Sequence, residues 1–474
     1  MTQRTDTLLL VNAMTGQFIS GVATRIFIVS LPTVAAALDA DILAVSWALI
    51  AYQLAGICLS VVFGRLGDIH GRYAIYGGGF VVMTLSSVLC GLAPTVGWLI
   101  AFRLVQGVGA AMIASATRVL AMEAMPEGAE GRANGFMTMS YHGGLLLGPP
   151  LGGLVIDWLS WRWIFFLLVP IGVAGTILTV IRARRRRGTP VEQAPAVDYV
   201  GAALLVVLTV LLTLVLDRRS AQALGAGSPG VMLVAFAVGL AGFLVHERRA
   251  ANPVVNLALF RIRMFVFSVL SLLLFATTAS VLTFLLPFYL QDVLRLSPSF
   301  MGLLFLSAPV LTISLAVLAG HLTDRVGPRI PASIGLAMVM AAFAIGIGLK
   351  LDSHWILPAL LLACTGVGQG FFNTPNQTAI IGSVPRAYRG FATGLVQMLF
   401  GLGSLLGISL GGALLTAMFR HYSGIPDATP SAGAPGPFVA AMSATYAVCS
   451  ILMLIALAAS LLRGGRRVQA AAMD

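Results

Sequence analysis

The stretch Gly64-Arg65-Leu66-Gly67-Asp68-Ile69-His70-Gly71-Arg72 joins two long apolar segments and decides the fold of this chain. A related stretch, Gly320-His321-Leu322-Thr323-Asp324-Arg325-Val326-Gly327-Pro328-Arg329, follows 256 positions later, again between apolar segments. Nine glycine and proline positions between 107 and 153 also recur at a constant offset of 259, as Gly366, Gly368, Pro385, Gly390, Gly394, Gly403, Gly407, Gly411 and Gly412. The chain is therefore a duplication, and two like-oriented halves that face one another suit a carrier that rocks about a central binding site.

The composition places the chain in a lipid bilayer. Of its 474 residues, 58% are hydrophobic and only 10% are charged, with a mean hydropathy of +0.95. About a quarter of the residues of a soluble protein are charged. About 20 apolar residues cross the hydrocarbon core, so we predict fourteen membrane-spanning helices. They lie near 8–38, 43–63, 73–94, 97–121, 134–158, 161–182, 198–216, 229–246, 264–290, 298–319, 330–349, 354–382, 389–419 and 438–462.

The placement of positive charge predicts the orientation. The chain has 29 Lys and Arg against 17 Asp and Glu. With the N-terminus in the cytoplasm, 21 of the 29 fall on inside loops or span ends, Arg118 among them, and six fall outside. Because cytoplasmic loops carry the excess of Lys and Arg, we expect both termini in the cytoplasm of a bacterium, with the protein in its inner membrane. The run Arg184–Arg187 is interpreted as an anchor on anionic lipid, and no nucleic acid is expected as a partner.

Several kinds of chemistry have no signal in the sequence. The four cysteines lie within apolar segments and lack the spacing of metal ligands, so no metal site is expected. A Gly-Lys-Ser/Thr phosphate loop is missing, and no nucleophile with a nearby base stands out. We therefore expect no catalytic residues, no cofactor and no enzymatic activity, and we expect transport to draw on an ion or substrate gradient.

The repeat divides the chain into three parts. Residues 1–182 form an N-terminal six-helix half, and residues 264–474 form a C-terminal six-helix half. Residues 183–263 contain a polar linker, Arg184 to Asp198, and two helices without a counterpart in either repeat. The predicted fold is an all-α membrane protein of two six-helix halves with two inserted helices.

The two signature stretches are predicted to be tight cytoplasmic turns that latch one conformational state. Glycine permits close turning, an Asp favours the positive end of a neighbouring helix, and an Arg can satisfy a C-terminal carbonyl. A plain topological turn is the alternative, but recurrence in the second half favours a latch. The candidate latch residues are Gly64, Asp68, Gly71, Arg72, Gly320, Asp324 and Gly327.

Two further segments combine small residues with unusual ones. Segment 97–121 holds Arg103 in its outer half, and an arginine inside a span costs at least about 2.5 kcal/mol and usually marks a cavity. In segment 134–158, glycines let helices approach closely and a proline kinks the axis; simple packing is the alternative reading of each glycine. Those residues are Gly144, Gly148, Pro149, Gly152 and Gly153.

These residues resemble the major facilitator superfamily and, within it, the fourteen-helix drug:proton antiporter branch. The resemblance covers essentially the whole chain. It rests on 64–72, on Arg103–Ala111, on Gly144–Gly153, and on Trp161-Arg162-Trp163-Ile164-Phe165 followed by Pro170-Ile171-Gly172. The resemblance implies alternating access and the export of amphipathic compounds driven by inward proton flow. The implied partners are a small-molecule substrate, protons and the lipid bilayer, and the chain is treated as a monomer.

Two departures from that branch concern the mechanism. The branch carries an Asp two residues before a Thr in its first helix, where this chain has Ala23 and Arg25. Leu168 stands where the branch typically has Asn. All 17 acids fall at span ends or in loops, so the predicted charge near the midplane is positive.

The candidate cavity residues follow from this positive midplane. We expect Arg25, near the middle of the first span, to bind substrate or gate its passage; a structural charge on backbone carbonyls is the alternative. His142, which titrates near neutral pH, is the proton-coupling candidate together with Arg103, with packing as its alternative. Four amides on one helical stripe either line the cavity or bond another helix. The predicted substrate or cavity residues are Arg25, Tyr52, Gln53, Arg103, Gln369, Asn373, Asn376 and Gln377.

We predict a secondary transporter that exports amphipathic or drug-like compounds in exchange for protons. One alternative is a carrier of an organic anion bound through Arg25 and Arg103, because a positively lined cavity repels cationic drugs. A second alternative is a non-transporting sensor on the same scaffold, which would not need intact latch stretches.

Overall fold

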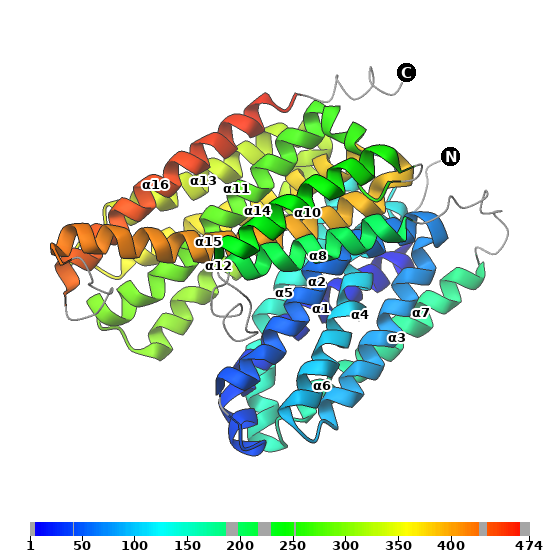
Figure 1. Ribbon diagram of the computed structural model, residues 1–474, viewed down its shortest axis with the longest axis horizontal. Coiled ribbons are helices and arrows are strands. Elements are labelled where there is room, and N and C mark those ends of the chain that lie inside the picture. The colour runs from blue at the N-terminus through cyan, green and yellow to red at the C-terminus, as the bar shows by residue number, and fades with distance from the viewer. Residues whose placement is uncertain are drawn as a thin grey trace.

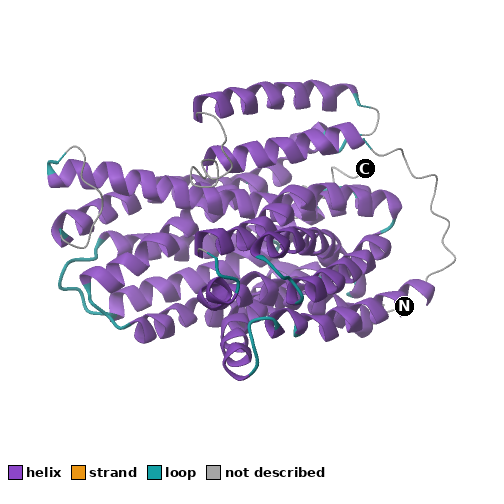
Figure 2. Cartoon of the chain, turned by 60° about the horizontal axis from the view of Figure 1, so that its bottom comes forward, coloured by secondary structure: helices purple, strands orange, loops and turns teal. Residues whose placement is uncertain are grey.

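The computed structural model describes residues 5–40, 42–185, 198–216, 229–250, 253–425 and 434–464, and all regular structure in these ranges is helical (Figure 2). The helices are α1 (Thr7–Ala37), α2 (Ile42–His70), α3 (Arg72–Gly91), α4 (Val96–Ala124), α5 (Glu130–Trp158), α6 (Trp163–Phe166), α7 (Leu168–Arg185), α8 (Tyr199–Leu216), α10 (Pro229–Arg249), η1 (Leu257–Arg261), α11 (Arg263–Phe288), η2 (Tyr289–Val293), α12 (Pro298–Val326), α13 (Arg329–Ile347), α14 (Ile356–Gly382), η3 (Arg386–Tyr388), α15 (Arg389–Ser423) and α16 (Pro435–Leu462).

The predicted all-helical membrane fold is confirmed, and the helices of the described ranges are consistent with the predicted count of fourteen. Within the described ranges, 12 helices are long and apolar enough to cross a membrane, and Tyr199–Val215 is a shorter apolar helix. The remaining helix, α5, has 29 residues. Its polar first turns, with Glu130 and Arg132, lower its apolar character, yet it packs against α1 and α12 among the other spans.

The structure corrects the prediction that the signature stretches are turns. Helix α2 runs on to His70 and α12 runs on to Val326, so most of each stretch is helical. Gly71 and Gly327 interrupt the helices with φ of +98° and +83°, a region that favours glycine. The chain can therefore reverse within one or two residues while Asp68 and Asp324 stay on rigid helix ends.

Helix packing repeats between the two parts of the chain. In the first part, α1 packs on α5 and α2 on α4; in the second, α11 packs on α15 and α12 on α14. Contacts between the two sets run from α5 to α12 and from α2 to α15. Figure 1 shows the two sets converging at the end where both termini lie and diverging toward the other end.

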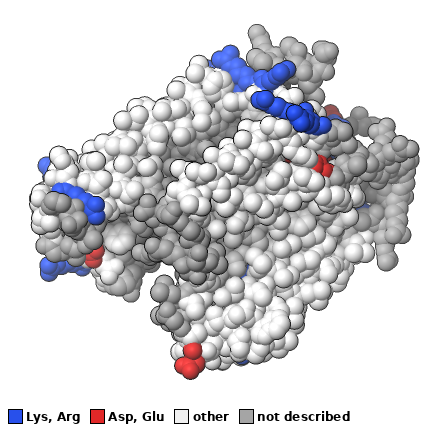
Figure 3. All heavy atoms as spheres, viewed as in Figure 1, with Lys and Arg blue, Asp and Glu red and all other residues white. Residues whose placement is uncertain are grey.

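The two helices without a repeat counterpart, α8 and α10, pack on each other. Helix α8 also contacts α2 and α15, one from each set, whereas α10 exposes an apolar face that includes Val231, Val234 and Val238. The charged side chains in Figure 3 gather near the ends of the molecule and leave a broad uncharged middle, as a bilayer requires. Residues 186–197, which include most of the predicted linker and the second half of the Arg184–Arg187 run, lie outside the described residues.

Candidate functional site

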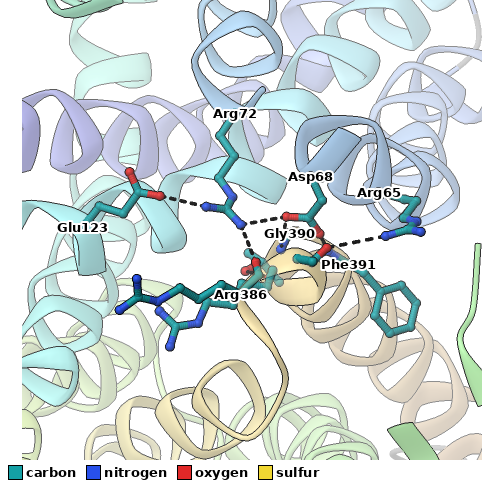
Figure 4. A network of polar contacts seen from close by, with 10 residues as sticks. Arg65, Asp68, Arg72, Glu123, Arg386, Gly390 and Phe391 are labelled. Carbon is teal, nitrogen blue, oxygen red and sulfur yellow. Dashed lines mark hydrogen bonds and ion pairs between the residues drawn. The ribbon is translucent and has the colours of Figure 1, made fainter. Parts of the chain in front are cut away.

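The first predicted latch residue, Asp68, binds the start of a helix from the other part of the chain (Figure 4). Its Oδ1 accepts a hydrogen bond from the backbone N–H of Gly390 at 3.0 Å, and its Oδ2 accepts one from Phe391 at 3.0 Å. The Asp68 side chain is only 1% exposed. Free N–H groups and the helix dipole make the start of α15 attractive to a carboxylate.

Arg72 ties the same contact to two further elements (Figure 4). Its Nη2 donates to Asp68 Oδ1 at 2.9 Å and to the carbonyl of Arg386 at 2.7 Å, while Nη1 donates to Glu123 at 2.7 Å. Arg65 adds a contact at 4.7 Å between its guanidinium and the ring of Tyr388. The end of α2 and the start of α3 are thereby joined to α4, η3 and α15.

The second signature stretch makes the same kind of contact, but here the aspartate belongs to the second part of the chain and the helix start to the first. Asp324 Oδ1 accepts from the N–H of Gly131 at 2.7 Å, and Oδ2 accepts from the N–H and the Nε of Arg132, each at 3.2 Å. The Asp324 side chain, 12% exposed, thus binds the start of α5. Each part of the chain therefore contributes a carboxylate to the first turn of a helix in the other.

Paired glycines bring the backbones at these contacts together. A Cβ on Gly64 would lie 2.2 Å from the carbonyl oxygen of Gly390, and a Cβ on Gly320 would lie 2.4 Å from that of Gly131. Any side chain would push the helices apart at both places. Five of the seven predicted latch residues thus lie in two equivalent contacts, and Gly71 and Gly327 end α2 and α12 beside them.

The glycines of α5 build its interface with α1. A Cβ on Gly144 would lie 2.3 Å from the Phe18 oxygen, and a Cβ on Gly152 would lie 3.0 Å from Ile26. Gly148 also faces α1, with its Cβ position 3.3 Å from Val22 O. Gly153 has nothing within 4 Å, and Pro149 lies inside the helix.

Arg103 is buried with 0% exposure in the first half of α4. Its Nε donates to the Ala48 carbonyl at 3.2 Å, and its Nη1 donates to Gln106 Oε1 at 2.7 Å. Its guanidinium lies 4.4 Å from the ring centre of Tyr52 and 4.9 Å from that of Phe27. In this conformation aromatic rings and bonded acceptors surround the charge of Arg103, and its predicted contact with substrate stays a prediction.

A second positive group lies where the sequence did not indicate one. Arg118, six residues before the end of α4, was counted among the span ends, but its side chain is only 4% exposed inside the bundle. Its Nε and Nη1 are buried without a hydrogen-bond partner in the described part of the chain. Arg118 interacts electrostatically with Tyr141 and His142 of α5.

Arg25 reaches the same place from α1. Its side chain is exposed, and a Cβ on Gly148 would lie 3.4 Å from the Cβ of Arg25. It interacts electrostatically with Tyr141 and His142, both of which are half-buried. Thr24 lies beside both Tyr141 and Tyr52. We call Arg25, Arg118, Tyr141 and His142 the arginine cluster.

The predicted amide stripe on α14 divides into two groups. Asn376 donates from Nδ2 to the Ser268 carbonyl at 3.0 Å and accepts at Oδ1 from Arg463 at 2.9 Å, so it joins α14 to other helices. The Oδ1 of Asn373 and the Oε1 of Gln377 are buried without a partner among the described residues. Gln369 is half-buried, and Gln53 on α2 is exposed.

The family profile described as Major Facilitator Superfamily matches residues 13–278 and 268–471 of this chain. The chain belongs to the Major Facilitator Superfamily. It is thus a multi-pass membrane transporter, as the sequence predicted.

Three proteins show how far the similarity to this superfamily member extends. The chain is 28% identical to the putative multidrug resistance protein MdtD of Serratia proteamaculans, over 94% of this chain and 90% of that protein. It is 30% identical to the multidrug resistance protein Stp of Mycobacterium tuberculosis, over 87% and 76% of the two chains. Its fold resembles the crystal structure of the human organic anion transporter MFSD10 (TETRAN), with a TM-score of 0.65 and 14% identity over 97% and 100% of the chains.

Proposed function

We propose that this transporter exports amphipathic, drug-like compounds by alternating access, in exchange for protons entering the cell. The observation that carries the proposal is the pair of equivalent contacts in which Asp68 and Asp324 each bind the first turn of a helix across the molecule. Similarity to relatives named multidrug resistance proteins supports the substrate class. The proposed location is a bacterial cytoplasmic membrane, with both termini in the cytoplasm.

The moving parts are the two six-helix halves, residues 1–182 and 264–474, with residues 183–263 as the inserted part. The closed contacts at the end that carries the termini correspond to a carrier shut toward the cytoplasm. Opening that side requires both aspartates to leave the helix starts that they bind, so the two contacts act as a latch. Because the contacts are polar and local, their loss can be offset by substrate or proton binding elsewhere.

His142 and Arg103 are the proposed coupling residues. His142 borders the arginine cluster on α5, and Arg103 carries a fixed charge against Tyr52. A proton that arrives at His142 changes the charge of the cluster and so alters its affinity for a bound compound. That dependence of one affinity on another is what an exchanger requires.

The arginine cluster favours one second candidate function, the transport of an organic anion. Arg25 and Arg118 both interact electrostatically with Tyr141 and His142 of α5. A sensor that does not transport would have no use for two equivalent latches, so we set that alternative aside.

The proposed function is tested with everted membrane vesicles that contain the protein, energised to an acid and positive interior. We would measure accumulation of three dyes, namely ethidium as a cation, fluorescein as an acid, and the methyl ester of fluorescein. Accumulation of at least one dye that stops when a protonophore is added supports a proton-coupled exporter. The same accumulation in vesicles without the protein, or none with it, refutes the proposal.

A further inference from the structure

We propose that the transported compound carries an acidic group and that Arg118, together with Arg25, binds its negative charge. This inference rests on the proposed function and assigns the substrate class of its site. It replaces Arg103 with Arg118 as the anion-binding arginine of α4.

The first support is the incomplete bonding of Arg118. Two buried nitrogens of Arg118 lack a hydrogen-bond partner among the described residues. No other arginine in the described ranges has more than one such nitrogen. The other buried arginines meet acceptors: Arg103 bonds Ala48 and Gln106, and Arg463 bonds Asn376 and Ser460. A buried donor without a partner is unfavourable, and a charged one especially so. An acceptor from outside the chain would satisfy Arg118.

The second support is the absence of a resident carboxylate. No ion pair joins Arg118 to an Asp or Glu side chain within the described ranges. The described acids lie at or near helix ends, as Asp68, Glu123 and Asp157 do, or in the connections between helices. The acidic group that pairs with the two guanidinium groups would therefore belong to the substrate, for example a carboxylate.

The third support is access. Arg25 is exposed and Tyr141 and His142 are half-buried, whereas Arg118 is only 4% exposed. Tyr141 offers a hydroxyl, and Thr24 offers another beside it. In the proposed site, a carboxylate, sulfonate or phosphate reaches the cluster on the side of Arg25 and completes the bonding of Arg118.

The test uses binding to the purified full-length protein in detergent. The probes are fluorescein, 1-naphthylacetic acid and decanoic acid, each beside its methyl ester, which keeps the apolar body and removes the charge. We compare the parent with Arg118→Gln, Arg118→Lys and Arg25→Gln. Arg261→Gln serves as the matched control, because it removes the same charge from an exposed residue of η1.

We expect at least one acid to bind at least tenfold more tightly than its ester, a difference of about 1.4 kcal/mol. Arg118→Gln should remove that preference and leave ester binding unchanged, Arg118→Lys should retain part of it, and Arg261→Gln should retain all of it. Arg25→Gln, at an exposed position, tests the cluster even where Arg118→Gln fails to fold. Equal binding of acid and ester by the parent overturns the inference, as does an acid preference that survives in Arg118→Gln.

The vesicle assay separates failure of this inference from failure of the proposed function. Export of ethidium or the ester, together with no preference for acids in the binding assay, supports the proposed exporter and refutes the anion site. If the acid preference is lost in Arg118→Gln but the parent exports no dye, the anion site is supported and the proposed exporter is refuted. Inorganic phosphate is tested as a competitor; displacement of the acid at equal concentration would contradict an amphipathic ligand.

Discussion

The substitution Asp68→Asn tests the latch most directly, because it changes one carboxylate and little volume. The native carboxylate accepts two backbone hydrogen bonds, from Gly390 and Phe391, and an ion pair from Arg72 at 2.9 Å. An asparagine can offer its carbonyl to one N–H but turns its amide N–H₂ toward the other. The variant keeps the helix and loses most of the attraction across the molecule.

The size of the loss follows from those contacts. A hydrogen bond to a charged group contributes about 1.5–3 kcal/mol, and at least one such bond disappears while another loses its charge. We expect the cytoplasm-closed state to lose about 2–4 kcal/mol relative to the open one, a shift of about 30-fold to about 1,000-fold in the equilibrium. The exchange cycle then stalls in the state open to the cytoplasm, so export should fall although the protein remains in the membrane.

The assay is a distance measurement between spin labels at His70 and Val326, which are exposed at the ends of α2 and α12. A cysteine-free background removes the four native thiols. We expect a longer distance population in Asp68→Asn than in the parent. Asp324→Asn is the matched variant, and its more exposed carboxylate predicts a smaller shift. Unchanged distances together with normal export in Asp68→Asn would falsify the latch.

Three further changes test other parts of the structure. In Gly131→Ala, the new methyl group would lie 2.4 Å from a backbone oxygen of α12, so export should fall at least tenfold, whereas Gly153→Ala, with free space around it, should export like the parent. Gln106→Ala removes the acceptor of Arg103 Nη1 and should lower the unfolding free energy by about 1–3 kcal/mol, seen as a lower melting temperature in detergent; an unchanged melting temperature contradicts this account of Arg103. His142→Gln should flatten the pH dependence of export, and a pH profile identical to the parent's removes His142 from proton coupling.

The sequence was sufficient to predict the helices and their repeat. Long apolar segments predict spans because the bilayer imposes one length on each, and the recurring glycines correspond to equivalent helix contacts, as at Gly131 and Gly390. The signature stretches were interpreted wrongly as turns. Their residues are compatible with a helix, and only the left-handed glycines at 71 and 327 end it.

The site was less accessible to sequence reasoning, because a polar residue in a span does not reveal which neighbour it meets. Arg118 lies near a segment end, where arginine is ordinary, and only the packing of α4 against its neighbours shows that its side chain is buried. Asn376 shares a stripe with Gln369, yet Arg463, directly after α16, donates a hydrogen bond to its amide oxygen. These partners lie far away in the chain and follow no local spacing.

The charge of the arginine cluster also bears on what drives export. A cation in the cluster would meet two guanidinium groups, whereas an anion would be attracted to them and would move outward with the inside-negative potential. That potential contributes about 2.3 kcal/mol per charge at 100 mV, close to a 50-fold concentration ratio. An exporter of acids therefore has less need of a carboxylate in its first helix to carry protons inward. The presence of Ala23 in place of the acid of the drug:proton branch, and of Arg25 in place of its threonine, is consistent with a carrier that binds negative charge.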